Sequence, residues 1–249
     1  MSVSFEQVES FAEDRFRLVH ERSLHIKEAL RKAIAQEGRV TSIEPFQDRL
    51  GHITDFEQLT CCPLFMDIRN STTQLSRHGP KVAYVVGHTF HATMGYIIEN
   101  SATGKLVDYT GDGVYALFLP DDEHSIEKVV ADAGLTAIRM MQAASYIVNP
   151  LIERCRDISD AGVVNGFAYG IGLSYGPVII TYIGSEYYRG IVAIGECVNR
   201  AHGFSNGRNR IVIAAEVYER YPKSQEGTVV IEQNVPGSYD IRWKPFKWE

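Results

Sequence analysis

The sequence predicts an α+β domain in which helices cover one face of a mainly antiparallel sheet. Segments with helical and with strand periodicity alternate along the 249 residues. The strand segments come largely in pairs around glycine-containing turns, as the strands of antiparallel hairpins do. With 45% hydrophobic and 22% charged residues, the composition is that of a globular protein. Helices that alternate with hairpins are typical of an α+β sandwich.

The N-terminal part of the chain differs from the rest. Residues 4–37 carry charges throughout, and their apolar residues recur at helical spacing, which predicts one or two amphipathic helices. The pattern becomes irregular over residues 38–60. We therefore expect an N-terminal helical segment at 1–55 and a main domain at 56–249, with the helical segment packed on that domain.

The main domain is predicted to begin with a buried strand and a helix, followed by a hairpin and a long helix. A second hairpin is expected where Tyr175, Gly176 and Pro177 provide turn residues. The predicted elements are the strand 61–68, the helix 82–100, the hairpin 105–120, the helix 125–155, the hairpin 167–184, the helix 196–204, the strand 209–215, the helix 215–221, and the strands 228–233 and 238–243.

Composition and charge argue against several classes of protein. The net charge of -6 argues against a broad nucleic-acid-binding surface. The four cysteines fit neither a disulfide framework nor a paired zinc motif, so we expect reduced thiols and a cytosolic protein. The acidic beginning of the chain lacks the apolar core of a signal peptide. The uncharged stretch 163–185 is broken by glycines and Pro177, which favours strands over a membrane span.

The first hairpin contains two carboxylates. Its strands are rich in Val, Leu, Tyr and Phe, and the sequence Thr-Gly-Asp-Gly at 110–113 provides the turn. Asp108 lies within a strand, and Asp112 lies at the tip. An Asp at a turn commonly bonds the local backbone, so the hairpin alone does not assign Asp112 a function.

A second set of polar residues follows the strand 61–68. This strand ends near Asp67, and the small polar run 69–73 leads from it into a helix. Backbone N–H groups at such a junction bind anions. If the hairpin tip lies beside this strand, Asp67 and Asp112 form a carboxylate pair that can hold hard divalent ions against phosphate oxygens. The residues therefore predict a two-metal site for a phosphorylated ligand.

Three motifs resemble class III nucleotidyl cyclases: LFMDIRNSTT, KLVDYTGDGVYALF and YGIGLSYGPVIITYIGSEYYRGIVAIGECVNRA. They occur in the order and at the separations of that family, and together they are specific. The similarity covers residues 58–245 and implies the ferredoxin-like cyclase fold. The stand-alone form is similar to the pyrimidine cyclases of bacterial anti-phage (Pycsar) systems. The resemblance implies a cytoplasmic second-messenger synthase whose cyclic product is read by a separate effector, without nucleic acid or membrane partners.

The resemblance also implies roles for individual residues. Asp67 and Asp112 match the aspartates that bind two divalent ions, Mg²⁺ or Mn²⁺, and the Ile68 carbonyl is a further metal ligand. Asn199 matches the asparagine that orients the ribose. The resemblance further implies that the site is completed between two protomers of a homodimer. The remaining nucleotide-binding positions are Phe65, the phosphate cradle Asn70, Ser71 and Thr72, and the base-reading positions Asp108 and Val192.

Two family positions are occupied by unexpected residues. Gly203 stands where the family usually has a transition-state arginine, four residues after Asn199. Ser238 stands where a lysine for the terminal phosphate is expected. Nearby cations are candidates to replace them, without a single assignment: Arg200, Arg208 and Arg210 for the first, and Arg242 and Lys244 for the second.

The base-reading positions favour UTP. Adenylyl cyclases place a lysine at the position of Asp108 and a polar residue at that of Val192. A carboxylate accepts the imino N–H that uracil and guanine both offer, whereas Val192 provides no second polar contact for guanine. The prediction is a uridylate cyclase that forms cyclic UMP and pyrophosphate. A guanylate or cytidylate cyclase remains an alternative, as does a local backbone contact for Asp108.

Other interpretations are weaker. A catalytically inactive cyclase-like nucleotide-binding domain is opposed by the presence of both aspartates and supported by Gly203. A diguanylate cyclase would require a second acid and an aromatic residue at the hairpin tip, which this sequence lacks. His88 and His91 have helical metal-pair spacing without an acidic third ligand nearby, which favours a structural role. Gly170 and Gly172 are better explained by packing of the predicted hairpin than by a nucleotide loop.

Overall fold

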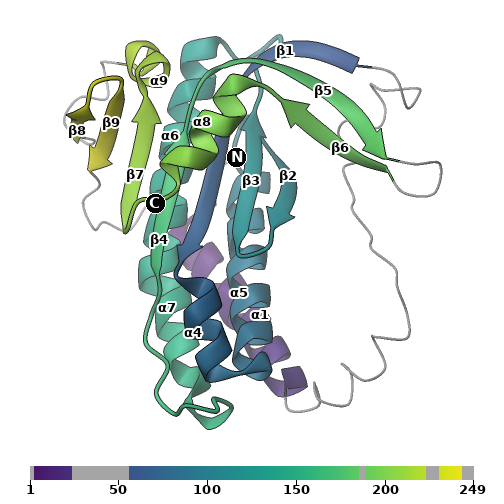
Figure 1. Cartoon of the computed structure of the whole chain (residues 1–249), viewed down its shortest axis with the longest axis vertical. Helices are drawn as coiled ribbons and strands as arrows, with labels where there is room; N and C mark the ends of the chain where they lie inside the picture. Colours follow the sequence, from purple (N-terminus) through teal and green to yellow (C-terminus); the bar gives the residue numbers. More distant parts are fainter. Residues whose placement is uncertain (1–2, 24–55, 185–188, 223–229, 243–249) are drawn as a thin grey trace.

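The computed structural model describes residues 3–23, 56–184, 189–222 and 230–242. These residues form a nine-stranded mixed sheet in the order β2-β3-β1-β4-β7-β9-β8, and β5 and β6 extend from one end of β1 (Figure 1). Only the pairing of β4 with β7 is parallel among the described ladders. The strands are β1 (Phe56–Arg69), β2 (Gly104–Thr110), β3 (Gly113–Phe118), β4 (Ala168–Leu173), β5 (Gly176–Gly184), β6 (Arg189–Ile194), β7 (Arg210–Ala214), β8 (Val230–Val235) and β9 (Ser238–Arg242).

The helices confirm the predicted α+β class. The described helices are α1 (Phe5–Ser23), α4 (Ser71–His78), α5 (Pro80–Glu99), α6 (Ile126–Ala143), α7 (Asn149–Glu153), α8 (Glu196–Phe204) and α9 (Ala215–Arg220). None of them combines the length and the apolar character needed to cross a bilayer. A π-helical turn at Ala144–Val148 joins α6 to α7, and a short 3₁₀ turn follows at Arg154–Asp157. The π turn precedes Pro150, whose ring disfavours a regular α-helical turn before it.

The central strand β1 separates two cores. Its side chains alternate, as strand geometry requires, so that Leu64, Met66 and Ile68 join a large core with α5 and α6. Phe65 joins a smaller core with residues of α8 on the opposite face. The expectation that helices cover only one face is therefore wrong, because α8 lies across the other face (Figure 1). The candidate site is on the α8 face.

Helix α1 packs on the main domain, as predicted. Val8, Ala12, Phe16 and Val19 are buried in the same core as α5 and α6. The ring of Phe11 stacks on that of Tyr96 in α5, with centroids 4.2 Å apart. The remainder of the predicted helical segment, from residue 24 to residue 55, lies outside the described residues.

The first predicted hairpin is confirmed. Strands β2 and β3 pair with Thr110 opposite Gly113, which leaves Gly111 and Asp112 as a two-residue turn. Gly111 adopts φ 68°, a left-handed conformation that glycine reaches without steric cost. The turn places Asp112 at the tip.

The second predicted hairpin is wrong. β4 and β5 do not pair with each other: both run antiparallel to β1 in one continuous register, in which Leu64 faces Leu173 and Cys61 faces Gly176. The break between them lies opposite Pro63, whose carbonyl still accepts from Ser174 N–H at 3.2 Å. Proline has no N–H to donate, so it interrupts the ladder without reversing the chain. The hairpin instead joins β5 to β6.

Candidate active site

Asp67 and Asp112 are brought together at one end of β1. Asp67 is the partner of Gly113 in the β1–β3 ladder, so the hairpin turn lies directly beside it. Ile68 N–H donates to the Asp112 carbonyl at 3.3 Å, which fixes the turn against β1. The pairing of β1 with β3 thus brings together, at one end of β1, two carboxylates that are far apart in the sequence.

The beginning of α4 completes this edge. Asn70 precedes α4 with φ 57°, and this left-handed residue turns the chain abruptly from strand into helix. The buried Ser71 donates its hydroxyl to Asp112 Oδ2. The first N–H groups of a helix have no acceptor within the helix, so those of the exposed Thr72 and its neighbours are available to an anion. A helix N-terminus, whose N–H groups are suited to an anion, therefore lies next to the carboxylate pair.

The two carboxylates repel each other. Burial and the charge of Asp112 raise the pKa of Asp67 to about 6, while the neighbouring Arg69 guanidinium opposes this shift. Arg69 pairs with Asp67 and is also 3.4 Å from the Asn206 side-chain oxygen. The ion pair therefore offsets only part of the excess negative charge at this edge.

This donor set fits hard divalent ions. Two carboxylates and nearby backbone carbonyls are oxygen ligands of the kind that Mg²⁺ and Mn²⁺ prefer. Among the described residues no group of three or more His, Cys, Asp or Glu side chains is placed to hold an ion. Water molecules or substrate phosphate oxygens would complete the coordination, as is common for Mg²⁺ held by one or two carboxylates. A bound cation would relieve the repulsion by Asp112 that, after burial, contributes to the raised pKa of Asp67.

Three residues near the carboxylates were not singled out from the sequence. Arg69 lies on the same face of β1 as Asp67, which period-two spacing would have indicated. The ring of His202, in α8, meets that of Phe65 edge-on with centroids 5.2 Å apart, and a positive charge on this ring would oppose the rise in the pKa of Asp67. Tyr115, in β3, stacks on Phe65 at 4.2 Å. The positions of His202 and Tyr115 depend on packing, and no local signal predicts them.

Among the described residues, Asn199, Val192 and Asp108 make no hydrogen bond with the carboxylate pair. Asn199 is exposed on α8, and no hydrogen bond among the described residues joins it to Asp67 or Asp112. Val192 is 36% exposed on β6, which among the described strands pairs with β5 alone. Asp108 is exposed on β2, and its Oδ1 accepts from Tyr109 N–H at 2.7 Å. This is the local backbone contact that the alternative interpretation of Asp108 predicts.

The residues that could replace the arginine expected at Gly203 and the lysine expected at Ser238 differ in whether other side chains already bind them. Arg200 is held by Glu196 and Glu216, and Arg210 by Asp240, so neither is free to replace an arginine at Gly203. Arg208 is exposed. Ser238 is buried in β9. The side chain of Arg242 and the whole of Lys244 lie outside the described residues.

The glycines of β4 have a structural explanation that differs from the predicted hairpin. A Cβ atom on Gly172 would lie 2.0 Å from the Ala201 carbonyl oxygen, and one on Gly170 would lie 2.0 Å from that of Ser205. Both glycines therefore allow α8 and the residues after it to approach the sheet closely. The four cysteines are free, as predicted, and all four are buried.

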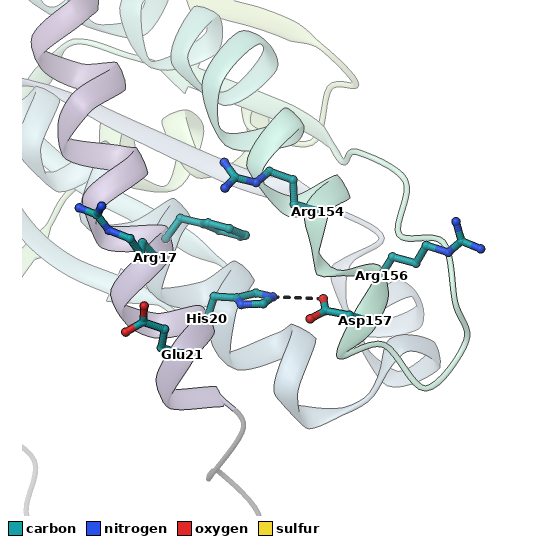
Figure 2. A pocket seen from close by; sticks show the side chains of 7 residues that line it. Arg17, His20, Glu21, Arg154, Arg156 and Asp157 are labelled. Atoms are coloured by element: carbon teal, nitrogen blue, oxygen red, sulfur yellow. Dashed lines mark hydrogen bonds and ion pairs between the residues drawn. The ribbon is translucent and has the colours of Figure 1, made fainter.

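A cavity of about 530 Å³ is lined by none of the candidate site residues. It is formed by α1 and by the region that follows α7, and Figure 2 shows its charged side chains. Across it, His20 Nε2 lies 3.2 Å from Asp157 Oδ1. Arg154 contacts both carboxylate oxygens of Glu13, at 3.2 and 3.1 Å. These contacts attach α1 to the domain.

Comparison with known proteins shows the fold. No protein-family model matches the sequence, and no curated protein matches it significantly. The guanylyl cyclase Cya2 matches with a TM-score of 0.61 and 19% identity, over 75% of this chain and 93% of that chain. The adenylyl cyclase CyaB from P. aeruginosa matches at 0.64 and 16%, over 78% and 100%. The guanylate cyclase domain of RhGC from Catenaria anguillulae, in complex with GTP, matches at 0.59 and 17%, over 76% and 99%. The chain therefore has the class III nucleotidyl cyclase fold.

Proposed function

We propose that this protein is a nucleotidyl cyclase that converts UTP to 3′,5′-cyclic UMP and pyrophosphate. The observation that carries the proposal is the juxtaposition of Asp67 and Asp112 beside the beginning of α4, on this fold. The resemblance of the sequence to the Pycsar pyrimidine cyclases supports a role in anti-phage defence, with a separate effector that reads the cyclic product.

The reaction requires positioning and electrostatic stabilisation. The substrate's 3′-oxygen forms a bond to the α-phosphorus, the bond from that phosphorus to the pyrophosphate oxygen breaks, and the 3′-hydroxyl proton is released. Asp67, Asp112 and the Ile68 carbonyl would hold two divalent ions, which when bound would make the hydroxyl more acidic and stabilise the phosphate charge. The N–H groups of Asn70, Ser71 and Thr72 hold the β- and γ-phosphates. Asn199 orients the ribose.

Base selection is assigned to Asp108 and Val192. Within the described residues, Asp108 Oδ2 accepts no hydrogen bond while Oδ1 contacts Tyr109 N–H, so one carboxylate oxygen is available to the uracil imino group. Phe65 is 8% exposed beneath Tyr115 and His202, so its contribution is to support the nucleotide site.

A homodimer completes the site. The exposed position of Asn199, apart from the carboxylate pair of its own chain, is consistent with two composite sites across a two-fold axis. The β5–β6 hairpin and the beginning of β1 expose apolar side chains that suit such an interface: Phe56, Ile179, Ile183, Val192 and Ile194.

Two competing functions would give a different outcome in a product assay. Gly203 favours a catalytically inactive nucleotide-binding domain, and the imino acceptor Asp108 also suits a guanylate cyclase. Purified protein is incubated with an equimolar mixture of the four nucleoside triphosphates and either Mg²⁺ or Mn²⁺, and the products are identified by mass spectrometry. Cyclic UMP as the main product, with its selectivity lost in Asp108→Ala, supports the proposal. Dominant cyclic GMP would overturn the UTP assignment, and nucleotide binding without any cyclic product would favour the inactive domain.

A further inference from the structure

A second cavity, of about 370 Å³, lies between α1, α5 and β2. Its volume falls within the range of roughly 300–1,000 Å³ that is typical of small-molecule sites. Its larger side chains are Arg15 of α1, Tyr84, His88 and His91 of α5, and Tyr109 of β2, and small residues of α5, including Gly87, complete the wall. None of these residues has a role in the proposed reaction.

The lining suits an aromatic anion. Four of the larger side chains are rings: Tyr84 and His88 have centroids 4.4 Å apart, and His91 and Tyr109 5.0 Å apart. Arg15 is the only permanently charged residue in the described lining, which contains no carboxylate. No ion pair joins Arg15 to another described residue, and its guanidinium lies 5.7 Å from the Phe11 ring centroid. A planar ring can stack on these walls while Arg15 binds an attached anionic group.

The cavity also adjoins the support of the carboxylate pair. His91 is half-buried behind the turn that carries Asp112: burial lowers its pKa, whereas the Gly113 carbonyl and the charge of Asp112 oppose that effect. The His91 Nε2 is shielded and has no hydrogen-bond partner among the described residues. Tyr109 belongs to the hairpin whose tip is Asp112. The wall formed by β2 is therefore continuous with the Asp112 turn, and the wall formed by α5 interacts with that turn through His91.

We propose that this cavity binds a small aromatic anion, a ring system that carries a phosphate or carboxylate, and that the bound anion alters the divalent-ion affinity of the Asp67–Asp112 pair through His91 and Tyr109. The coupling rests on the proposed metal site, whereas the binding itself does not. The cavity of Figure 2 is less suited to an anion, because Arg154 is already bound by Glu13 and the lining includes Glu21 and Asp157.

Binding is tested with 1-naphthyl phosphate, by calorimetry on the full chain in the presence of a chelator. The controls are 1-naphthol, which lacks the charge, and inorganic phosphate, which lacks the ring. A Cβ atom on Gly87 would meet only His91 Nδ1, at 3.9 Å, so Gly87→Leu fills the cavity without a backbone clash and favours the helix. Gly87→Ala is the matched control, and Arg156→Gln tests the cavity of Figure 2.

We expect 1-naphthyl phosphate to bind wild type, Gly87→Ala and Arg156→Gln alike. Gly87→Leu and Arg15→Gln should each weaken binding by at least about tenfold, with thermal unfolding confirming that both fold. Unchanged affinity in Gly87→Leu, or equal affinity for inorganic phosphate, would overturn the assignment of the cavity. So would the absence of binding to wild type.

Coupling is tested by titrating Mn²⁺ with and without 1-naphthyl phosphate. Because coupling is reciprocal, the fold-change in Mn²⁺ affinity must equal the fold-change in probe affinity caused by Mn²⁺. Probe binding that leaves Mn²⁺ affinity unchanged would overturn the coupling. If wild type without probe does not bind Mn²⁺, the metal site of the proposed function is wrong, and the binding result for the cavity still stands independently.

Discussion

Asp67 and Gly113 are direct partners in the antiparallel ladder between β1 and β3. This pairing fixes Asp112, the residue before Gly113, beside Asp67, while Ser71 binds Asp112 from the beginning of α4. The sheet register therefore holds two carboxylates close together, and burial together with the charge of Asp112 raises the pKa of Asp67 to about 6.

Without a cation, this arrangement should cost stability at neutral pH. The folded-state pKa of Asp67, about 6, is higher than its ordinary value of 3.8. The native state therefore binds more protons between these values, and stability falls as pH rises through this window. In a chelator, we expect Asp67→Asn to be more stable than wild type at pH 7 by about 1–2 kcal/mol, after allowance for solvent screening.

Urea unfolding at pH 7 and pH 4 measures this difference, which should disappear at the lower pH. Asp122→Asn removes an exposed loop carboxylate and should change neither value. Added Mn²⁺ should stabilise wild type and leave Asp67→Asn unchanged. Equal stabilisation of both proteins would place the ion elsewhere.

Gly203 is predicted to limit turnover. A Cβ atom at this position would meet nothing within 4 Å, so a longer side chain fits without displacing its neighbours. Gly203→Arg should raise kcat by at least about tenfold by supplying positive charge for the transition state. It should also stabilise the fold by about 0.5–1 kcal/mol, because glycine is unfavourable in a helix. Gly203→Ala is the control, which should gain stability without activity; equal rates for the two variants would refute a role for the added charge.

The composite site is tested by complementation. Asp67→Ala and Asn199→Ala each remove one half of every site, so each homodimer should be inactive. In a heterodimer of the two variants, one site retains both halves, and a fraction of the activity should return on mixing. Subunit exchange is verified first with differently tagged chains. Exchange without recovered activity would exclude sites shared between protomers.

Local sequence predicted the first hairpin well and the second poorly, for a physical reason. Thr110 to Gly113 form a true two-residue turn, because Gly111 takes up the left-handed conformation. Gly176 and Pro177 carry the same kind of signal, yet Gly176 has no positive φ and the chain continues along β1. The difference depends on pairing with a strand more than a hundred residues earlier, which turn propensities do not encode.

The candidate site, like the hairpins, could be predicted only in part from local sequence. The cradle after Asp67 followed from a strand that leads into a helix, and the structure has that junction at Asn70. The meeting of Asp67 with Asp112 required the β1–β3 register, which the sequence indicated only through its resemblance to a family. The position of His202 over Phe65 depends on the close approach of α8 to Gly172. No local pattern reports an approach of this kind.

The most direct test is the rate of cyclic nucleotide and pyrophosphate formation by wild type, Asp67→Ala and Asp112→Ala in Mn²⁺. Each substitution removes a metal ligand from the edge of the sheet while leaving the core intact. The account predicts that both variants unfold cooperatively, as wild type does, and that each loses at least about a thousandfold in turnover. Near-wild-type turnover in either folded variant would contradict it.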